Sequence, residues 1–340
     1  MNSDLNPRSG WVVGIDAGGT RTRAVLADAA DGRTLGEGVA GPGNALTVPG
    51  PELTDHLAEA LASAVPEAGR TRVAAVVGGF AGAARAPEAE PGRVRARAAL
   101  TAALTRLGIG TEAVEVYSDI EAAFAGAPGQ PADGLALVAG TGAVAARIEG
   151  RVLGATSGGD GWLLGDDGGG FWIGREAARA ALRAADGRGE PTALTAAVGR
   201  ALGVPASVLP PADGGLWAPA QRAAYRACLL PAVMDRPPVR LADLAPLVPS
   251  AAAEKDAVAA AVLQEAATHL ATTLAALGPH RGEVLVVTGG LVAPDGPLLA
   301  PLTERLSPLD LTTTPVTDGR AGAVALARLL AIGRRPAEAP

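Results

Sequence analysis

The sequence predicts an α/β protein built from two duplicated domains. A strand that ends in a Gly/Thr turn and continues as a second strand occurs at residues 11–28 and again at 134–150, with Thr141 standing where Thr20 stands. Strands and helices follow each copy, as α/β domains require. The 340 residues are enough for two domains that each bury a core of their own.

Hydrophobic periodicity gives the elements of the first copy in order. We expect a three-stranded meander and then alternating helices and strands: strands 11–18, 21–28 and 35–41, helix 51–65, strand 72–80, helix 92–107, strand 112–118 and helix 120–127. We place the first domain at residues 1–120, because the pattern restarts after this point.

The second copy repeats the meander and is then interrupted. We expect strands 134–140, 143–150 and 151–157, a helical stretch 172–205, a Pro-rich stretch 205–250 with short helices, an amphipathic helix of about 251–277 that carries Lys255, strand 283–290, helix 297–306, strand 311–314 and helix 319–333. The second domain is therefore placed at 121–318, with a helical insertion at about 172–280. The last helix is expected to pack back on the first domain, and the tail 334–340 is expected to fray.

Composition excludes several classes of protein. Lys and Arg number 29 against 35 Asp and Glu, and this formal charge of −6 argues against nucleic acid or an anionic membrane as the main partner. Cys228 is the only cysteine, which excludes an internal disulfide, a four-cysteine zinc site and a self-contained iron–sulfur site. No window of about 18 apolar residues lacks a charge or a breaker, and the N-terminus is polar. We expect a soluble, cytoplasmic protein.

The first Gly/Thr turn is a candidate phosphate site. Asp16 stands at a strand end, and Gly18, Gly19 and Thr20 form the turn. Glycines let backbone N–H groups approach an anion, the hydroxyls of Thr20 and Thr22 add donors, and the Asp16 carboxylate could hold Mg²⁺ through water. A plain hairpin with a glycine turn is the alternative.

The second turn, Gly140-Thr141-Gly142, has the same design. Two such hairpins can hold the β- and γ-phosphates of a nucleotide between two domains. The pair is more specific than either turn alone, since short glycine motifs recur by chance.

Asp119 lies between the two turns, where a predicted strand ends and a helix begins. It could be the helix N-cap. It could also be a general base that accepts the proton of an attacking hydroxyl. Both roles are compatible, because a base must be oriented.

The stretch from Gly158 to Leu182 combines many glycines with three aromatics and three aspartates ahead of a long helix. Asp166 is a candidate for hydrogen bonds to sugar hydroxyls, Asp160 could face the same pocket, and Asp167 is interpreted as structural. The alternative is helix capping by Asp166 or Asp167. Gly289 and Gly290 end an apolar strand and would let an adenine ring lie against backbone, although glycine pairs often simply end strands.

In order along the chain, these motifs resemble the BadF/BadG/BcrA/BcrD ATPase family, and in particular its N-acetylglucosamine kinase branch, in the superfamily of sugar kinases, Hsp70 and actin. The resemblance covers nearly the whole chain and rests on the segments GIDAGGTRT, GPGN, GGFAGA, SDIEAAFAGA, AGTGA, GGDGWLLGDDGGGFWIG, LAPLVPSAAAEKDAVA, VVTGG and DGRAGAVALA. It implies two actin-like (ribonuclease H-like) domains with nucleotide and sugar in the cleft between them.

The resemblance also implies roles for individual residues. Asp119 takes the position of the catalytic base, Thr20 and Thr141 contact phosphate, and Gly289 and Gly290 fall near the adenosine. The residues at sugar-binding positions are Asn44, Ala143, Val144, Gly159, Asp160, Gly161 and Asp166. The family's mammalian kinase has an aromatic residue at the position of Asp160 and a serine at that of Ala143, so the preferred 2-substituent of the sugar is open.

The implied activity is transfer of the γ-phosphoryl of MgATP to the 6-hydroxyl of N-acetylglucosamine. Glucosamine kinase is the alternative that an acidic Asp160 favours, N-acetylmuramic acid is a further candidate substrate, and a non-catalytic sugar or nucleotide sensor is a third reading. The dehydratase activators of the family need two cysteines per subunit, and the ROK sugar kinases carry a Cys-rich zinc motif, so Cys228 alone argues against both. Family members are often dimers, so a homodimer is one expected assembly.

Overall fold

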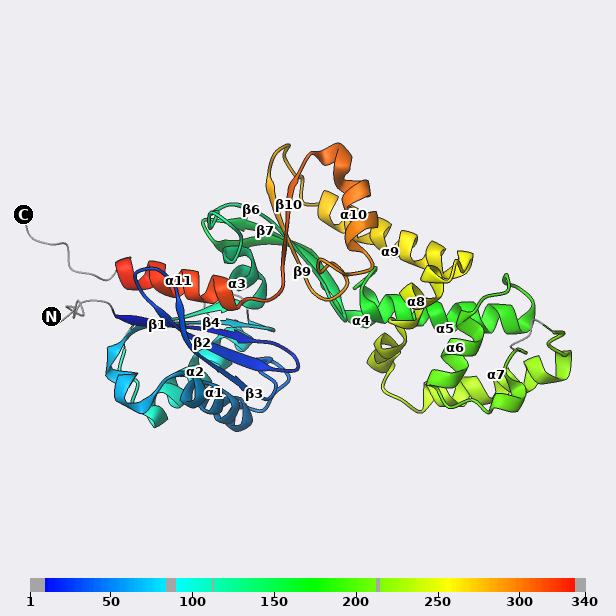
Figure 1. Ribbon diagram of the computed structural model, residues 1–340, viewed down its shortest axis with the longest axis horizontal. Coiled ribbons are helices and arrows are strands. Elements are labelled where there is room, and N and C mark those ends of the chain that lie inside the picture. The colour runs from blue at the N-terminus through cyan, green and yellow to red at the C-terminus, as the bar shows by residue number, and fades with distance from the viewer. Residues whose placement is uncertain (1–9, 84–89, 112, 212–214, 334–340) are drawn as a thin grey trace, which may run out of the picture.

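The computed structural model describes residues 10–83, 90–111, 113–211 and 215–333, and the N-terminal residues and the tail 334–340 lie outside this part. Two five-stranded sheets lie side by side along the molecule, and a helical region extends beyond the second sheet (Figure 1). The strands are β1 (Trp11–Ala17), β2 (Thr22–Asp28), β3 (Thr34–Ala40), β4 (Val73–Phe80), β5 (Val114–Ser118), β6 (Gly134–Ala139), β7 (Ala143–Glu149), β8 (Val152–Gly158), β9 (Val284–Thr288) and β10 (Thr312–Val316).

The two sheets have one topology. The first has the order β3-β2-β1-β4-β5 and the second, read from the other edge, β8-β7-β6-β9-β10. In each, the meander is antiparallel and the last two strands run parallel to the central one. The expected α/β class and the duplication are confirmed.

Alternation along β1 gives the first sheet two apolar faces. Val13 and Ile15 pack with helices α1 (Gly50–Ala64) and α2 (Pro91–Leu107), whereas Val12 packs with α11 (Arg320–Gly333) on the opposite face. Gly14 also faces α11, and a Cβ there would meet the backbone of Val324. The sheet is therefore buried on both sides.

The helix that follows each sheet's last strand packs on the other sheet. Helix α3 (Asp119–Ala125) follows β5, and its Phe124 is buried with Ala136 and Val286 of the second sheet. Helix α11 follows β10 but contacts β1, β2 and β4 of the first sheet as well as α3. The proposed domain boundary at 120/121 thus falls inside a helix that contacts both sheets.

The helices inserted between β8 and β9 form their own core against the second sheet. The remaining helices are α4 (Gly161–Leu164), α5 (Gly170–Asp186), α6 (Leu194–Ala201), α7 (Pro219–Met234), α8 (Leu247–Ala253), α9 (Ala257–Ala275) and α10 (Leu299–Leu306), with 3₁₀ helices η1 (Glu67–Arg72), η2 (Ala206–Val208), η3 (Pro238–Leu244) and η4 (Ser307–Leu309). None of the helices described is both long and apolar enough to cross a bilayer.

The structure interrupts two predicted segments of this region, the helical stretch 172–205 and the single helix 251–277. The stretch 172–205 contains two helices, α5 and α6, that Gly187 and the following turn separate. The predicted helix 251–277 is also two, and Lys255 lies in the turn between α8 and α9 with φ 68° rather than on a helix. Asp256 caps α9 by accepting a hydrogen bond from Ala259 N–H at 2.9 Å, so the second helix begins after the lysine.

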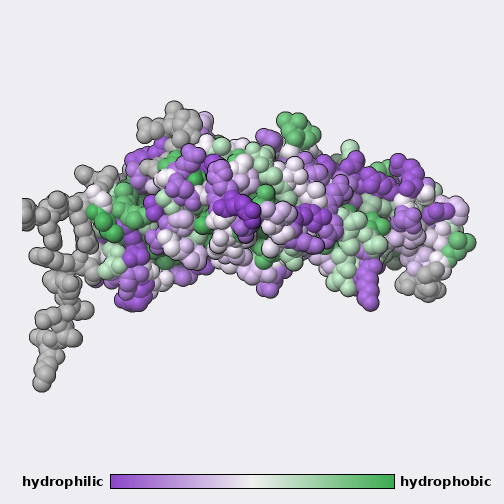
Figure 2. Space-filling view, turned by 90° about the horizontal axis from the view of Figure 1, so that it is seen from above, coloured by the Kyte–Doolittle hydropathy of each residue, from purple (hydrophilic) through white to green (hydrophobic). Residues whose placement is uncertain are grey.

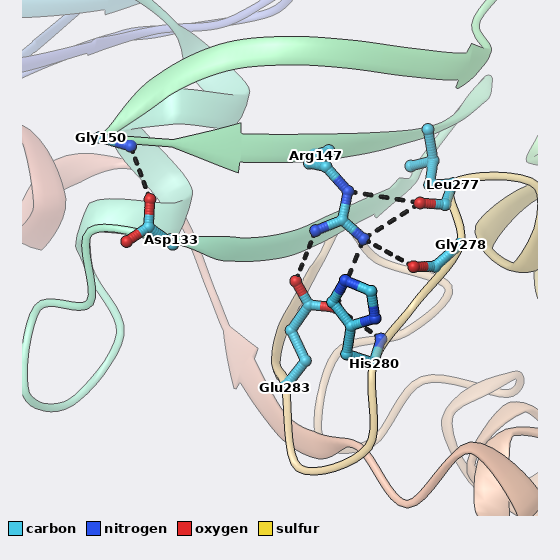
Figure 3. Close-up of polar contacts among 7 residues, drawn as sticks. All are labelled: Asp133, Arg147, Gly150, Leu277, Gly278, His280 and Glu283. Atoms are coloured by element: carbon cyan, nitrogen blue, oxygen red, sulfur yellow. Dashed lines mark hydrogen bonds and ion pairs between the residues drawn. The ribbon is translucent and has the colours of Figure 1, made fainter.

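One arginine joins the meander of the second sheet to the loop before β9 (Figure 3). Arg147 of β7 donates to Glu283 Oε1 at 2.6 Å and to the carbonyl oxygens of Leu277 and Gly278 at 3.0 and 3.1 Å. Burial favours a higher pKa for the Glu283 carboxyl, but the hydrogen bonds from Arg147 and from His280 N–H hold that pKa below its usual value.

On the face drawn in Figure 2, hydrophilic residues extend along the whole molecule, interspersed with apolar groups.

Candidate active site

The first Gly/Thr turn joins β1 to β2 and projects from the sheet. The Gly18 N–H closes it by donating to the Arg21 carbonyl at 2.9 Å, and Gly19 and Thr20 are exposed at its tip. Thr22 is placed differently, because its hydroxyl is fully buried beside Gly43, without a hydrogen-bond partner among the described residues. In this conformation Thr20, and not Thr22, is accessible to a phosphate.

Asp16 lies at the carboxyl end of β1 and is almost fully buried. It pairs across the antiparallel ladder with Arg23, whose Nη1 lies 3.2 Å from Asp16 Oδ2. Burial raises the pKa of Asp16, and the nearby Asp318 carboxylate raises it further, against the opposing effect of Arg23. Each carboxylate already has a cationic partner, since Asp16 is paired with Arg23 and Asp318 accepts a hydrogen bond from Arg320 Nε at 2.9 Å. Among the residues that the structure describes, no group of three or more acidic, His or Cys side chains could hold a metal ion, so these residues fit a divalent cation only through its water shell.

The second turn is tied to the start of a long helix. Gly140 C=O accepts a hydrogen bond from Gly170 N–H at 2.8 Å, and Thr141 C=O accepts one from Phe171 N–H at 2.9 Å. Gly170 is the first residue of α5, and the N-cap is Gly169, which has no side chain that could cap the helix. The positive end of the helix dipole therefore lies at the turn. The N–H groups of Gly170 and Phe171 hold the turn in place and are not free for a ligand, so only the dipole favours an anion here.

Asp119 is the first residue of α3, directly after β5. The predicted alternative that Asp119 caps the helix was wrong, because Ser118 is the N-cap and forms a capping box with Glu121. Asp119 Oδ1 accepts the N–H of Ile120 at 3.0 Å instead. The hydrogen bond from Ile120 N–H therefore orients the Asp119 carboxylate, while Ser118 serves as the N-cap of the helix.

The environment of Asp119 suits a base that works near neutral pH. Burial raises its pKa to about 6, and the Asp16 and Glu121 carboxylates add to this effect, while the Ile120 N–H opposes it. Strand β4 lies between β1 and β5, and its Gly79 pairs with both Asp16 and Tyr117. A glycine at this position places no side chain between the two aspartates.

The glycine-rich loop after β8 brings several candidate sugar residues together. Asp166 has φ 57°, and its Oδ1 accepts the Ala143 N–H at 3.3 Å beside Gly142. Burial raises the pKa of Asp166, and the neighbouring Asp160 and Asp167 carboxylates contribute. Gly159 and Gly161 have positive φ, so the loop turns sharply on either side of Asp160.

Asn44 behaves as a turn former. Its Oδ1 accepts hydrogen bonds from the N–H groups of Leu46 and Thr47 at 2.9 and 3.1 Å, and it lies beside Gly82. Among the described residues, no hydrogen bond or ion pair joins Asn44 to the loop of Asp160 and Asp166, or the first turn to the second. The structure therefore groups the candidate residues by domain, with Asp16 and Asp119 on the first sheet.

A pocket of about 420 Å³ opens beside the second turn. It brings together Gly140, Thr141 and Gly290, which the sequence placed at the phosphates and the adenosine. Gly289, with φ 100°, lies behind them against the backbone of Ala139. The remaining lining residues are Gly170, Ala242, Ala245, Pro246, Pro249, Leu291 and Pro297.

Sequence reasoning missed three contributions. The first is Asp318, whose carboxylate raises the pKa of Asp16. Asp318 begins the segment DGRAGAVALA, which carries part of the family resemblance, but a single Asp before a helix does not by itself indicate a catalytic or binding role. Glu121 could have been found from the spacing Ser118-x-x-Glu121, which is that of a capping box. The residues of η3 and α8 that line the pocket belong to the Pro-rich stretch, whose role the sequence left open.

A family model for the BadF/BadG/BcrA/BcrD ATPase family matches residues 13–327. The chain belongs to this family. Among curated proteins, the N-acetylmuramic acid/N-acetylglucosamine kinase of Clostridium acetobutylicum is 30% identical over 186 residues, which are 54% of this chain and 57% of that protein. The chain thus spans little more than half the length of this relative.

Solved structures support the actin-like sugar-kinase fold. A candidate N-acetylglucosamine kinase from Chromobacterium violaceum is 25% identical, with a TM-score of 0.64 over 96% of this chain and 100% of that one. A ROK family glucokinase from Streptomyces griseus, solved with glucose and AMPPNP, is 22% identical with a TM-score of 0.55, over 94% and 99% of the two chains. At this identity the second likeness concerns the fold alone.

Proposed function

We propose that this family member is an ATP-dependent amino-sugar kinase that transfers the γ-phosphoryl of MgATP to the 6-hydroxyl of N-acetylglucosamine. The observation that carries the proposal is Asp119: an oriented carboxylate at a strand end, beside Asp16, with its pKa raised to about 6. Such a group is ionised at neutral pH and still basic enough to take a proton.

In the proposed reaction Asp119 accepts the proton of the sugar 6-hydroxyl while O6 forms its bond to the γ-phosphorus, and the bond between that phosphorus and the β–γ bridging oxygen breaks to release ADP. The exposed tip of the first turn and the second turn at the α5 N-terminus would hold the phosphates. Asp16 would hold Mg²⁺ through water, and the ion would offset phosphate charge. Closure of the two domains would exclude water from the reaction.

The sugar is assigned to the loop of Asp166. This carboxylate lies at the Ala143 N–H, next to the second turn, and is only partly buried, so its oxygens can also accept hydrogen bonds from sugar hydroxyls. Asn44, Val144, Gly159 and Gly161 complete the proposed sugar site. The N-acetylated substrate is supported by the names of the relatives, one of which also acts on N-acetylmuramic acid.

Glucosamine is the second candidate substrate. Asp160 is exposed, makes no side-chain bond as N-cap of α4, and lies close enough to Asp166 to raise the pKa of that group. A carboxylate at this position would attract a free 2-ammonium group through a charge-assisted hydrogen bond, whereas the N–H of an acetamide would offer only a weaker, neutral one.

The test is release of ADP from MgATP with N-acetylglucosamine, glucosamine, N-acetylmuramic acid and glucose supplied separately, followed by NMR of the product to locate the phosphate. Turnover with N-acetylglucosamine supports the main proposal. Turnover only with glucosamine that Asp160→Asn abolishes supports the second. If nucleotide binds but none of the four sugars is phosphorylated, the kinase proposal fails for these substrates and a sensor becomes the better hypothesis.

Variants assign the role of Asp119. Asp119→Asn should lower kcat by roughly 10²–10⁴-fold and leave nucleotide binding nearly unchanged, because only the proton transfer is lost. Asp235→Asn, an exposed aspartate at the end of α7, is the matched control and should keep full activity. Normal turnover by Asp119→Asn would contradict the mechanism.

A further inference from the structure

The lining of the 420 Å³ pocket is almost free of polar side chains. Of its residues, three are glycines, three are prolines, two are alanines and one is a leucine, so Thr141 alone brings a hydroxyl. The volume is within the usual range for small-molecule sites. Because Gly140 and Thr141 belong to the second turn, the pocket continues directly from the proposed phosphate position.

The backbone of the lining offers few free donors. Pro246, Pro249 and Pro297 have no N–H, and the N–H groups of other lining residues are already donated within the protein. The Gly140 N–H donates to the Gly142 carbonyl at 2.9 Å, and the Gly170 N–H donates to the Gly140 carbonyl at 2.8 Å. The Ala245 N–H donates to the Ala242 carbonyl at 3.0 Å, and the Leu291 N–H donates to the Ala139 carbonyl at 3.2 Å. These atoms hold the pocket's shape and are not available to a ligand.

The polar groups that remain do not separate the purines. The amino group of adenine would need an acceptor, and the carbonyl oxygens of Gly140, Thr141, Ala242, Ala245 and Leu291 already accept N–H groups within the protein. Adenine and guanine differ at position 6, where adenine has an amino donor and guanine a carbonyl acceptor, but both present N7 as an acceptor. The Thr141 hydroxyl can donate or accept and so suits either base. Among the described residues no hydrogen bond is recorded for the Gly290 N–H, and this donor can serve N7 of both.

We infer that this pocket binds the base of the phosphoryl donor by shape and apolar contact without reading its hydrogen-bonding edge, so that MgATP and MgGTP are used with similar efficiency. The inference rests on the proposed function for the assignment of the pocket to the nucleotide. Apolar pockets discriminate between similar ligands by up to about 10²-fold, whereas sites that hydrogen-bond a distinguishing group reach about 10⁴–10⁵-fold.

The first experiment measures the Kd of ATP and GTP with Mg²⁺ by calorimetry without sugar, and then kcat/KM for both with the sugar that is phosphorylated. We expect the two nucleotides to agree within about ten-fold in both measurements. A preference for ATP of more than about 100-fold overturns the inference, as does failure to bind either nucleotide. Equal binding without phosphorylation of any sugar supports the inference while the kinase proposal fails.

A variant tests whether this pocket holds the base. Gly290 does not need positive φ, and a Cβ there meets no atom within 4 Å, so Gly290→Val should fold normally and project into the pocket. Both Kd values should rise together by at least about ten-fold. Gly110→Val, at a glycine with equally open surroundings between α2 and β5, is the control and should change neither. If Gly290→Val folds and binds both nucleotides as before, the base lies elsewhere and the inference is overturned.

Discussion

The Glu121 carboxylate accepts a hydrogen bond from the backbone N–H of Leu153 at 2.8 Å, which joins the helix of Asp119 to the second sheet. Its other oxygen accepts from Ser118 N–H and Ser118 Oγ at 2.7 and 3.0 Å, at the end of the first sheet. Glu121 is almost completely buried. One side chain thus connects both domains two residues from the proposed base.

Glu121→Gln should therefore weaken both the fold and the reaction. A glutamine amide cannot accept at both ends, so one of the N–H groups of Ser118 and Leu153 would lose its partner at a cost of about 1–3 kcal/mol. We expect kcat to fall more than KM changes, because the start of α3 would shift with Asp119 on it. Urea unfolding and steady-state kinetics measure the two effects, and exposed Glu304→Gln should alter neither. An equal loss in kcat and nucleotide affinity would indicate a general structural effect instead.

The raised pKa of Asp119 predicts two pH dependences. The proposed base must be ionised, so kcat/KM should fall about ten-fold per pH unit below the pKa of about 6. Stability should change in the opposite direction: the folded pKa lies above the unfolded value, so the contribution of this group is fully present below pH 3.8 and is lost as pH rises through about 6. Asp119→Asn should remove that part of the stability profile. Activity that stays constant down to pH 4.5 would rule out Asp119 as the base.

The contact between α11 and α3 depends on one glycine. A Cβ at Gly322 would meet the Ala122 carbonyl and the Gly126 N–H, which are backbone atoms of α3 and its cap. Although alanine normally favours a helix over glycine by about 1 kcal/mol, Gly322→Ala should lower the free energy of unfolding by more than that gain and reduce kcat through displacement of α3. Gly333→Ala on the same helix meets no atom and should be neutral or stabilising. Thermal unfolding of the two variants and of the unchanged protein tests this prediction. A Gly322→Ala variant as stable as the unchanged protein would contradict the close packing of α11 against α3.

The Arg147–Glu283 pair should matter much more than an exposed pair nearby. Arg147→Met leaves a largely buried carboxylate and two carbonyl groups without their donor, so we expect a loss of about 2–3 kcal/mol at pH 7. The folded pKa of Glu283 is lowered, so this stabilisation is present above pH 4.5 and disappears as pH falls through the folded pKa. Arg281→Met, which removes an exposed pair with Asp310, should cost less than about 1 kcal/mol. Denaturant unfolding at pH 7 and pH 3 measures both, and a cost of Arg147→Met that does not shrink at pH 3 would contradict the assignment.

Local patterns predicted most of the elements, because each depends on residues close in sequence. The strand at Trp11–Ala17 and the helix at Pro91–Leu107 lie within a residue of their expected bounds. The break at Lys255 was missed because periodicity continues across it, and only the Asp256 cap and the αL turn separate α8 from α9. Hydrophobic periodicity indicates which face is buried but does not show whether the chain turns within that face.

The duplicated α/β plan, the family and the residue types of the candidate site could all be predicted before the fold was known, because strand alternation, glycine turns and motif order depend only on the order of residues along the chain. Only the tertiary structure placed Glu121 between the sheets, Asp318 beside Asp16, and η3 and α8 around the pocket. It also buried Thr22 and exposed Thr20. The physical reason is that burial, pKa and pocket walls arise from contacts between segments up to hundreds of residues apart, and no local pattern encodes such contacts.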